Sequence, residues 1–104
     1  MDTFKHRVIN FVKTVPKGKA VSYGQVAAKA GSPRAARQVG AILRSIDASD
    51  GKIPWWRVVN NKGIISIKGN WTATKQLQKE ILIKEGIKIS ENFSLDIEKY
   101  RFKN

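Results

Sequence analysis

Reactive side chains are scarce in this chain of 104 residues. It contains no cysteine and one histidine, His6. The absence of cysteine excludes disulfides, thiolate metal sites and a cysteine nucleophile, and one histidine is too few for a zinc site with three protein ligands. We therefore expect no metal and no cofactor. The chemistry that remains is binding through aromatic faces and positive charge.

Two adjacent tryptophans, Trp55 and Trp56, stand between Pro54 and Arg57 in the stretch KIPWWRVVNNKG at residues 52–63. Tryptophan is highly buried on average, so core packing is the simplest explanation for both. In an extended chain, however, neighbouring side chains point to opposite faces, and at most one of the pair then enters a given core. The other tryptophan must face something else.

The chain is strongly basic: 20 lysines and arginines stand against 8 acidic residues, which gives a net charge of +12. Such a charge repels itself and usually accompanies an anionic partner, and nucleic acid is the first candidate. A coat of lysines that only keeps the protein in solution is the alternative.

Length and hydropathy predict a single small domain. We expect one domain over residues 1–104, present as a monomer. The sequence has no apolar run long enough to span a bilayer and no signal peptide, so we expect a cytoplasmic protein without a membrane partner, associated with the nucleoid through DNA.

Apolar spacing and capping residues predict a mainly α-helical chain. The expected elements are a small β-hairpin over residues 57–67 and helices over residues 2–14, 23–30, 33–45 and 72–86. Ser22 and Gln25 have the spacing of a capping box, and Ser32 followed by Pro33 is typical of a helix start. Thr72 is expected to cap the last helix.

The second and third helices are separated only by Gly31 and Ser32, which predicts a helix-turn-helix. A helix-turn-helix that is followed by a hairpin, in a chain as basic as this one, indicates a winged helix-turn-helix that binds DNA. The third helix combines small residues, which allow close approach to a groove, with arginines that meet phosphates: Ala35, Ala36, Gly40, Ala41, Arg34, Arg37 and Arg44. Alternatively, the alanines only favour helix formation and the arginines are solvated.

Three stretches carry a resemblance to a known family: VSYGQVAAKAGSPRAARQVGAIL, IPWWRVV and KEG. They resemble the C-terminal, DNA-binding domain of O6-alkylguanine-DNA alkyltransferases over residues 4–88. Those enzymes carry a Pro-Cys-His-Arg motif whose cysteine takes the alkyl group from the damaged base. Pro54 and Arg57 match this motif, but Trp55 stands at the cysteine position and Trp56 at the histidine position. The chain is most similar to the alkyltransferase-like proteins, which have tryptophan in place of the acceptor and usually keep the histidine.

The resemblance implies a surface for DNA and a pocket for a flipped base. Tyr23 matches the tyrosine that rotates the phosphate of the target nucleotide, Arg37 the arginine that fills the vacated stack, and Glu85 the glutamate that supports the cysteine–histidine pair. The residues implied to contact DNA are Tyr23, Ser32, Arg34, Arg37 and Gln38. Those implied for the lesion pocket are Tyr23, Pro54, Trp55, Arg57, Val58, Val59, Lys68 and Gly69.

The function implied is non-enzymatic: the protein binds O6-alkylguanine in duplex DNA, flips it out and channels it to nucleotide excision repair. Together with the alternation of faces, this implies that Trp55 faces the pocket and that Trp56 turns away to pack. An enzyme with another nucleophile is one alternative, but alkyl acceptance needs a soft, strong nucleophile such as a thiolate. A winged-helix transcription regulator is the other, and it would not account for the stretch IPWWRVV.

Overall fold

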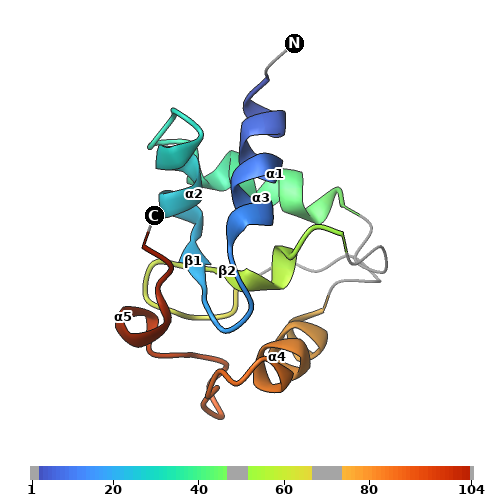
Figure 1. Cartoon of the computed structure of the whole chain (residues 1–104), viewed down its shortest axis with the longest axis vertical. Coiled ribbons are helices and arrows are strands. Elements are labelled where there is room, and N and C mark those ends of the chain that lie inside the picture. Colours follow the sequence, from blue (N-terminus) through green and yellow to red (C-terminus); the bar gives the residue numbers. More distant parts are fainter. Residues whose placement is uncertain (1–2, 47–51, 67–73, 104) are drawn as a thin grey trace.

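A computed structural model of the chain describes residues 3–46, 52–66 and 74–103. Its elements in chain order are α1 (Phe4–Thr14), β1 (Val21–Ser22), α2 (Tyr23–Lys29), α3 (Ala36–Arg44), the 3-10 helix η1 (Trp55–Arg57), β2 (Val58–Val59), α4 (Lys75–Lys84) and α5 (Ile97–Tyr100). In Figure 1, α1, α2 and α3 lie together, α4 and α5 lie at the opposite end, and the two short strands lie between them.

The first three helices pack on one another because each buries one apolar face. α1 begins after Thr3, whose side chain accepts a hydrogen bond from the backbone N–H of His6 (3.2 Å). The predicted pair of consecutive helices, α2 and α3, is confirmed, and both pack against α1. Their buried faces form one cluster: Val8, Phe11, Val12, Val26, Ala27, Val39 and Leu43.

The predicted start of α3 at Ser32 and Pro33 is wrong. The N-cap of α3 is Ala35, which has no side-chain capping bond. Ser32 instead closes α2: its N–H donates to the carbonyl of Ala27 (2.9 Å), and the N–H of Gly31 donates to that of Ala28 (3.1 Å). With Gly31 at a φ of +94°, this is a Schellman ending. The turn between the helices is therefore longer than the predicted two residues.

The capping box at the start of α2 is half confirmed. The Ser22 hydroxyl accepts from the N–H of Gln25 (3.0 Å), as predicted. The Gln25 side chain does not reach back; it donates to the carbonyl of Phe102 (2.6 Å) and accepts from Arg101 (3.1 Å). The amide thus joins α2 to the C-terminal segment, whose bonded residues lie 76 and 77 positions away and are not revealed by local spacing.

The predicted β-hairpin over residues 57–67 is wrong. β2 pairs in parallel with β1, with Val21 opposite Val58 and Ser22 opposite Val59. Residues 60–63 do form a tight turn, but the chain beyond it bonds to the C-terminal segment, where the N–H of Ile65 donates to the Phe93 carbonyl (2.8 Å). The two-stranded sheet therefore joins distant parts of the chain and sets β2 beside the start of α2.

The last long helix is confirmed over a shorter range than predicted. α4 is capped by Thr74, whose hydroxyl accepts from the N–H of Leu77 (3.0 Å); the predicted cap, Thr72, lies outside the described residues. Leu82 is buried, and Gly86, at a φ of +92°, follows the C-terminal end. The segment beyond it covers a second apolar cluster made of Ala20, Val59, Ile65, Leu82, Ile87, Leu95 and Ile97.

Gly63→Ala is expected to destabilise the protein more than Gly86→Ala. Both glycines have a positive φ, +84° and +92°, which costs other residues about 1–2 kcal/mol. A Cβ at Gly63 would overlap the carbonyl oxygen of Leu95, whereas a Cβ at Gly86 meets no described atom within 4 Å. Urea unfolding of both variants separates the clash from the backbone strain. Equal losses would contradict the close contact with Leu95.

Candidate nucleic-acid interface

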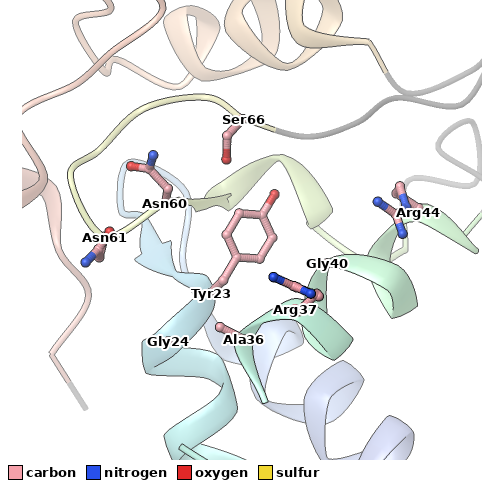
Figure 2. A pocket seen from close by; sticks show the side chains of 9 residues that line it. All are labelled: Tyr23, Gly24, Ala36, Arg37, Gly40, Arg44, Asn60, Asn61 and Ser66. Carbon is pink, nitrogen blue, oxygen red and sulfur yellow. The ribbon is translucent and has the colours of Figure 1, made fainter. Parts of the chain in front are cut away.

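A hollow of about 770 Å³ opens between α2, α3 and the segment of residues 60–66. Figure 2 shows the Tyr23 ring in its middle, with Arg37 and Arg44 of α3 on one side and Asn60 and Asn61 on the other. The lining thus offers cations, amides and hydroxyl groups, which are the groups that bind phosphate and sugar oxygens in DNA. The structure therefore brings together Tyr23 and Arg37, two of the predicted DNA contacts.

Small residues leave this hollow open. Gly24, Ala36 and Gly40 belong to its lining, and a Cβ at Gly40 would lie 4.0 Å from Cε1 of Tyr23. A larger side chain on this face of α3 would fill the space beside the tyrosine ring. The geometry thus supports the prediction that small residues of the third helix allow close approach, and contact with DNA itself stays a prediction.

The Tyr23 hydroxyl is held in its neutral form. Burial raises the pKa of Tyr23 above its ordinary value of 10.0, against the opposite effects of a hydrogen bond with the Ser66 side chain and of the Arg44 charge. At neutral pH the hydroxyl therefore keeps its proton and can donate to a phosphate oxygen. In Figure 2 it points towards Ser66, so a phosphate bound here would compete with Ser66 for this group.

The remaining predicted DNA contacts gather just before and within the first turn of α3. Ser32, Arg34 and Gln38 line a second hollow of about 470 Å³ together with Pro33 and Ala35. Arg34 and Gln38 are exposed there. The five predicted contacts thus form two groups, one in each hollow, and their binding to DNA stays a prediction.

The two tryptophans lie in a turn of 3-10 helix and not in an extended stretch. The N–H of Arg57 donates to the carbonyl of Pro54 (3.1 Å), which closes this turn. The indole rings nevertheless diverge and meet edge to face, with centroids 5.9 Å apart and planes at 86°. Trp55 is 2% exposed in the cluster beneath α1–α3, and its indole Nε1 has no hydrogen-bond partner among the described residues. Trp56 is half-buried between the two clusters.

A carboxylate joins Trp56 to Arg57. Trp56 Nε1 donates to Glu85 Oε2 (3.0 Å), and Arg57 donates to both carboxylate oxygens, from Nε to Oε1 (3.0 Å) and from Nη2 to Oε2 (2.6 Å). Nη1 of Arg57 donates to the carbonyl of Val15 (2.7 Å), and its guanidinium lies 5.3 Å from the centroid of the Trp56 ring. Glu85 therefore holds Trp56, the side chain at the position where the resemblance places a histidine.

Glu85 is expected to make stability depend on acid pH. Burial alone raises the pKa of Glu85, but the hydrogen bonds from Arg57 and Trp56, the Arg57 charge and the Gly18 N–H outweigh it, so the pKa lies below its ordinary 4.5. The unfolded chain then takes up the proton first, and stability present above about pH 4.5 is lost as the pH falls through the native pKa. Glu85→Gln should flatten this dependence. Urea unfolding at several pH values measures the change.

The same variant should also destabilise the protein at neutral pH by about 3 kcal/mol, because it leaves a mostly buried guanidinium without its carboxylate. The Arg57 and Glu85 side chains are 15% and 8% exposed. Glu98→Gln is the matched control, since Glu98 is 79% exposed and pairs with Arg101 at 3.4 Å, an interaction of little energetic value. Equal effects of the two substitutions would contradict the role assigned to Glu85.

A buried glutamine, Gln78 on α4, anchors the tryptophan turn and was missed by sequence reasoning. It is 0% exposed, and its Nε2 donates to the carbonyls of Trp56 (3.0 Å) and Val58 (2.9 Å). A signal for it exists in the sequence: Gln78 lies four residues before the buried Leu82, on the face where an apolar residue is expected.

The other residues implied for the lesion pocket are partly accounted for. Pro54, Trp55, Val58 and Val59 are buried and do not line the hollow around Tyr23, so their side chains belong to the core. The expectation that Trp55 faces a pocket while Trp56 packs is therefore not met in this structure, because Trp55 is the more buried of the two rings. Lys68 and Gly69 lie outside the described residues.

Among the described residues, no cluster of three or more histidine and acidic side chains could hold a metal. Nor does any helix in this part of the chain have the length and apolar character needed to cross a membrane.

Comparisons with known proteins agree with this geometry. The family model for the DNA-binding domain of 6-O-methylguanine DNA methyltransferase matches residues 3–87. The chain is 42% identical over 101 residues to a DNA base-flipping protein of Escherichia coli, covering 97% of this chain and 75% of the relative. It is 36% identical over 107 residues to alkyltransferase-like protein 1 of Schizosaccharomyces pombe, covering 99% and 97%.

A solved structure confirms the fold. The crystal structure of S. pombe Atl1 in complex with damaged DNA containing O6-carboxymethylguanine superposes with a TM-score of 0.89 at 35% identity. The match covers 100% of this chain and 98% of the other. The small sheet, the helix-turn-helix and the C-terminal segment thus form an arrangement already seen in a protein bound to damaged DNA.

Proposed function

Because the chain belongs to the family of the 6-O-methylguanine DNA methyltransferase DNA-binding domain, we propose that it binds duplex DNA and flips an O6-alkylated guanine out of the stack without reacting with it. The observation that carries the proposal is the hollow that Tyr23 and Arg37 line together with the small residues Gly24, Ala36 and Gly40. The relatives named for base flipping and the Atl1 structure with damaged DNA support it.

The geometry suits the steps of base flipping. Extruding a base costs a few kcal/mol, and the cost is lowest when the base is damaged or weakly paired. Tyr23 offers a neutral hydroxyl to the phosphate of the rotated nucleotide, and the exposed Arg37 is long enough to enter the space that the base leaves. Because Gly40 has no side chain, it leaves room for the DNA backbone beside the Tyr23 ring.

The proposal excludes alkyl transfer to the protein because of the residue at the acceptor position. The chain has no cysteine, and Trp55 stands where the related enzymes carry theirs. An indole cannot accept an alkyl group as a thiolate does. Once a flipped base uncovers part of this buried ring, the indole can instead form an apolar, aromatic wall for an alkylated guanine, a type of contact worth about 1–3 kcal/mol per base.

The transcription-regulator alternative loses part of its support, because the hairpin that would have formed its wing is absent from the described residues. Transfer of the bound lesion to nucleotide excision repair follows from the family resemblance alone. It stays a prediction, to be tested by pull-down of excision repair proteins on lesion DNA.

The function is tested by binding to two duplexes that differ only in one O6-methylguanine. We expect tighter binding to the lesion duplex, and binding to the plain duplex that weakens steeply with salt because phosphate contacts release counterions. Mass spectrometry of the protein after incubation should show no added methyl group. Equal affinity for both duplexes would contradict lesion recognition, and a methylated protein would contradict the non-enzymatic function.

A further inference from the structure

We propose that Trp56 is a positioning residue for lesion recognition: anchored by Glu85, its ring sets the orientation of the Trp55 ring. The inference rests on the proposed function, in which Trp55 forms a wall of the lesion pocket. It assigns a role to the indole that stands at the family's histidine position, a role different from proton relay.

The Trp56 ring is held from two sides. At its edge, Nε1 donates to Glu85 Oε2 (3.0 Å), and that carboxylate is itself held by two hydrogen bonds from Arg57. At its face, the Arg57 guanidinium lies 5.3 Å from the ring centroid, within the range of a cation–π interaction. Arg57 is in turn tied to α1's end through the carbonyl of Val15 (2.7 Å).

The Trp55 ring, by contrast, has no polar contact with the described part of the chain that would orient it. Its buried Nε1 finds no hydrogen-bond partner among the described residues, so the packing of its neighbours must set its plane. Among the described residues, the directional interaction available to this ring is the edge-to-face contact with Trp56, at 5.9 Å and 86°. An orientation fixed at Glu85 is thereby passed to the ring at the acceptor position.

The backbone that follows Trp56 is held in place. Gln78 bonds the carbonyls of Trp56 and Val58, and β2 pairs with β1 directly afterwards. Loss of the bond to Glu85 is therefore expressed in ring orientation. An indole N–H also has no acceptor state and does not titrate near neutral pH, whereas a histidine in its place would change its charge between about pH 5 and 8. The anchor consequently holds over the whole neutral range.

The first test needs no DNA. Two indoles at this distance and angle should give an exciton couplet in the circular dichroism spectrum. Glu85→Ala keeps both indoles but removes the oxygen that accepts from the Trp56 N–H, so the couplet should fall to half or less. Gly63→Ala, which is expected to destabilise the protein through Leu95 and not through either indole, controls for general destabilisation and should keep it. An unchanged couplet in Glu85→Ala would overturn the proposal.

The second test asks whether Trp56 acts through Trp55. We measure the ratio of affinities for an O6-methylguanine duplex and the matched plain duplex in a double-mutant cycle. Trp56→Phe should lower this ratio several-fold in the wild-type chain and hardly at all in a Trp55→Phe background. The same loss in both backgrounds would overturn the proposal.

The two tests also separate this inference from the proposed function. A wild-type chain that shows no preference for the lesion duplex would overturn the proposed function and, with it, the role in recognition. The couplet would still decide whether Glu85 sets the geometry of the two rings.

Discussion

Arg37→Ala is expected to remove most of the preference for lesion DNA, roughly a tenfold loss in the ratio of lesion to plain affinity, because a residue that fills the vacated stack acts only when a base is flipped. Tyr23→Ala should have a similar effect, because it removes the hydroxyl that contacts the phosphate of the rotated nucleotide. Arg34→Ala should weaken both complexes alike, since a phosphate contact carries no information about the lesion. The structure supports this division, because Arg34 lies in the second hollow, apart from Tyr23 and Arg37.

These variants are compared by fluorescence anisotropy on both duplexes and by the fluorescence of 2-aminopurine at the flipped position. Arg37 is exposed, so its truncation leaves the core intact. Tyr23 is half-buried, and Tyr23→Phe serves as its control because it keeps the ring beside Gly40 and removes only the hydroxyl. An unchanged affinity ratio in Arg37→Ala would show that this arginine does not enter the stack.

The parts of the fold that sequence reasoning predicts well are set by neighbours in the chain. Ser22 caps α2 through a residue three positions away, and Gly31 and Gly86 end helices because they adopt a positive φ. Ser32 shows the limit of this reasoning: its hydroxyl suggests a helix start, yet its backbone N–H closes the preceding helix. Two local signals compete there, and spacing alone does not decide between them.

The parts that sequence reasoning mispredicts depend on distant partners. The stretch after Arg57 has the alternation and turn of a hairpin, but β2 finds its partner in β1, more than thirty residues earlier. Gln25 likewise bonds to the C-terminal segment. Cross-strand pairing and side-chain bonds of this kind leave no periodic trace, so neither was predictable from the pattern.

The site was predicted mainly through the resemblance. It named Tyr23, Arg37 and Glu85, and the structure places the first two together and the third against Trp56. The resemblance did not reveal how Glu85 would bond to an indole, because the family usually has a histidine there. Asn60, Asn61 and Ser66 were also missed, since polar residues in a turn give no sign of facing a hollow.

Trp55→Cys combined with Trp56→His is expected to give slow but measurable methyl transfer from O6-methylguanine DNA to the protein, whereas Trp55→Cys alone should give little or none. In the reaction, the thiolate sulfur forms a bond to the methyl carbon while the bond from that carbon to O6 breaks, and the released guanine takes up a proton. A cysteine with a pKa of about 8.5 is only a few per cent thiolate at neutral pH, so a base beside it is required.

The structure explains why the second substitution matters. The Trp56 indole bonds to Glu85 but donates only, so it cannot take a proton from a neighbouring thiol. A histidine at position 56, oriented by the same carboxylate through one nitrogen, would leave the other free to accept that proton. Glu85, held by Arg57, is already in place for this arrangement.

Each variant must first be shown to fold and to bind lesion DNA, because truncating the buried Trp55 can cost about 3–5 kcal/mol and could mimic a lack of reactivity. Thermal unfolding and anisotropy provide these controls, and mass spectrometry of the protein measures the transferred methyl group. Rapid transfer by Trp55→Cys alone would show that the histidine is dispensable. A folded double variant that binds the lesion but gains no methyl group would contradict the placement of Trp55 beside the alkyl group. A thiolate at position 55, with its base restored, can reach the methyl carbon only if the bound lesion lies against that position.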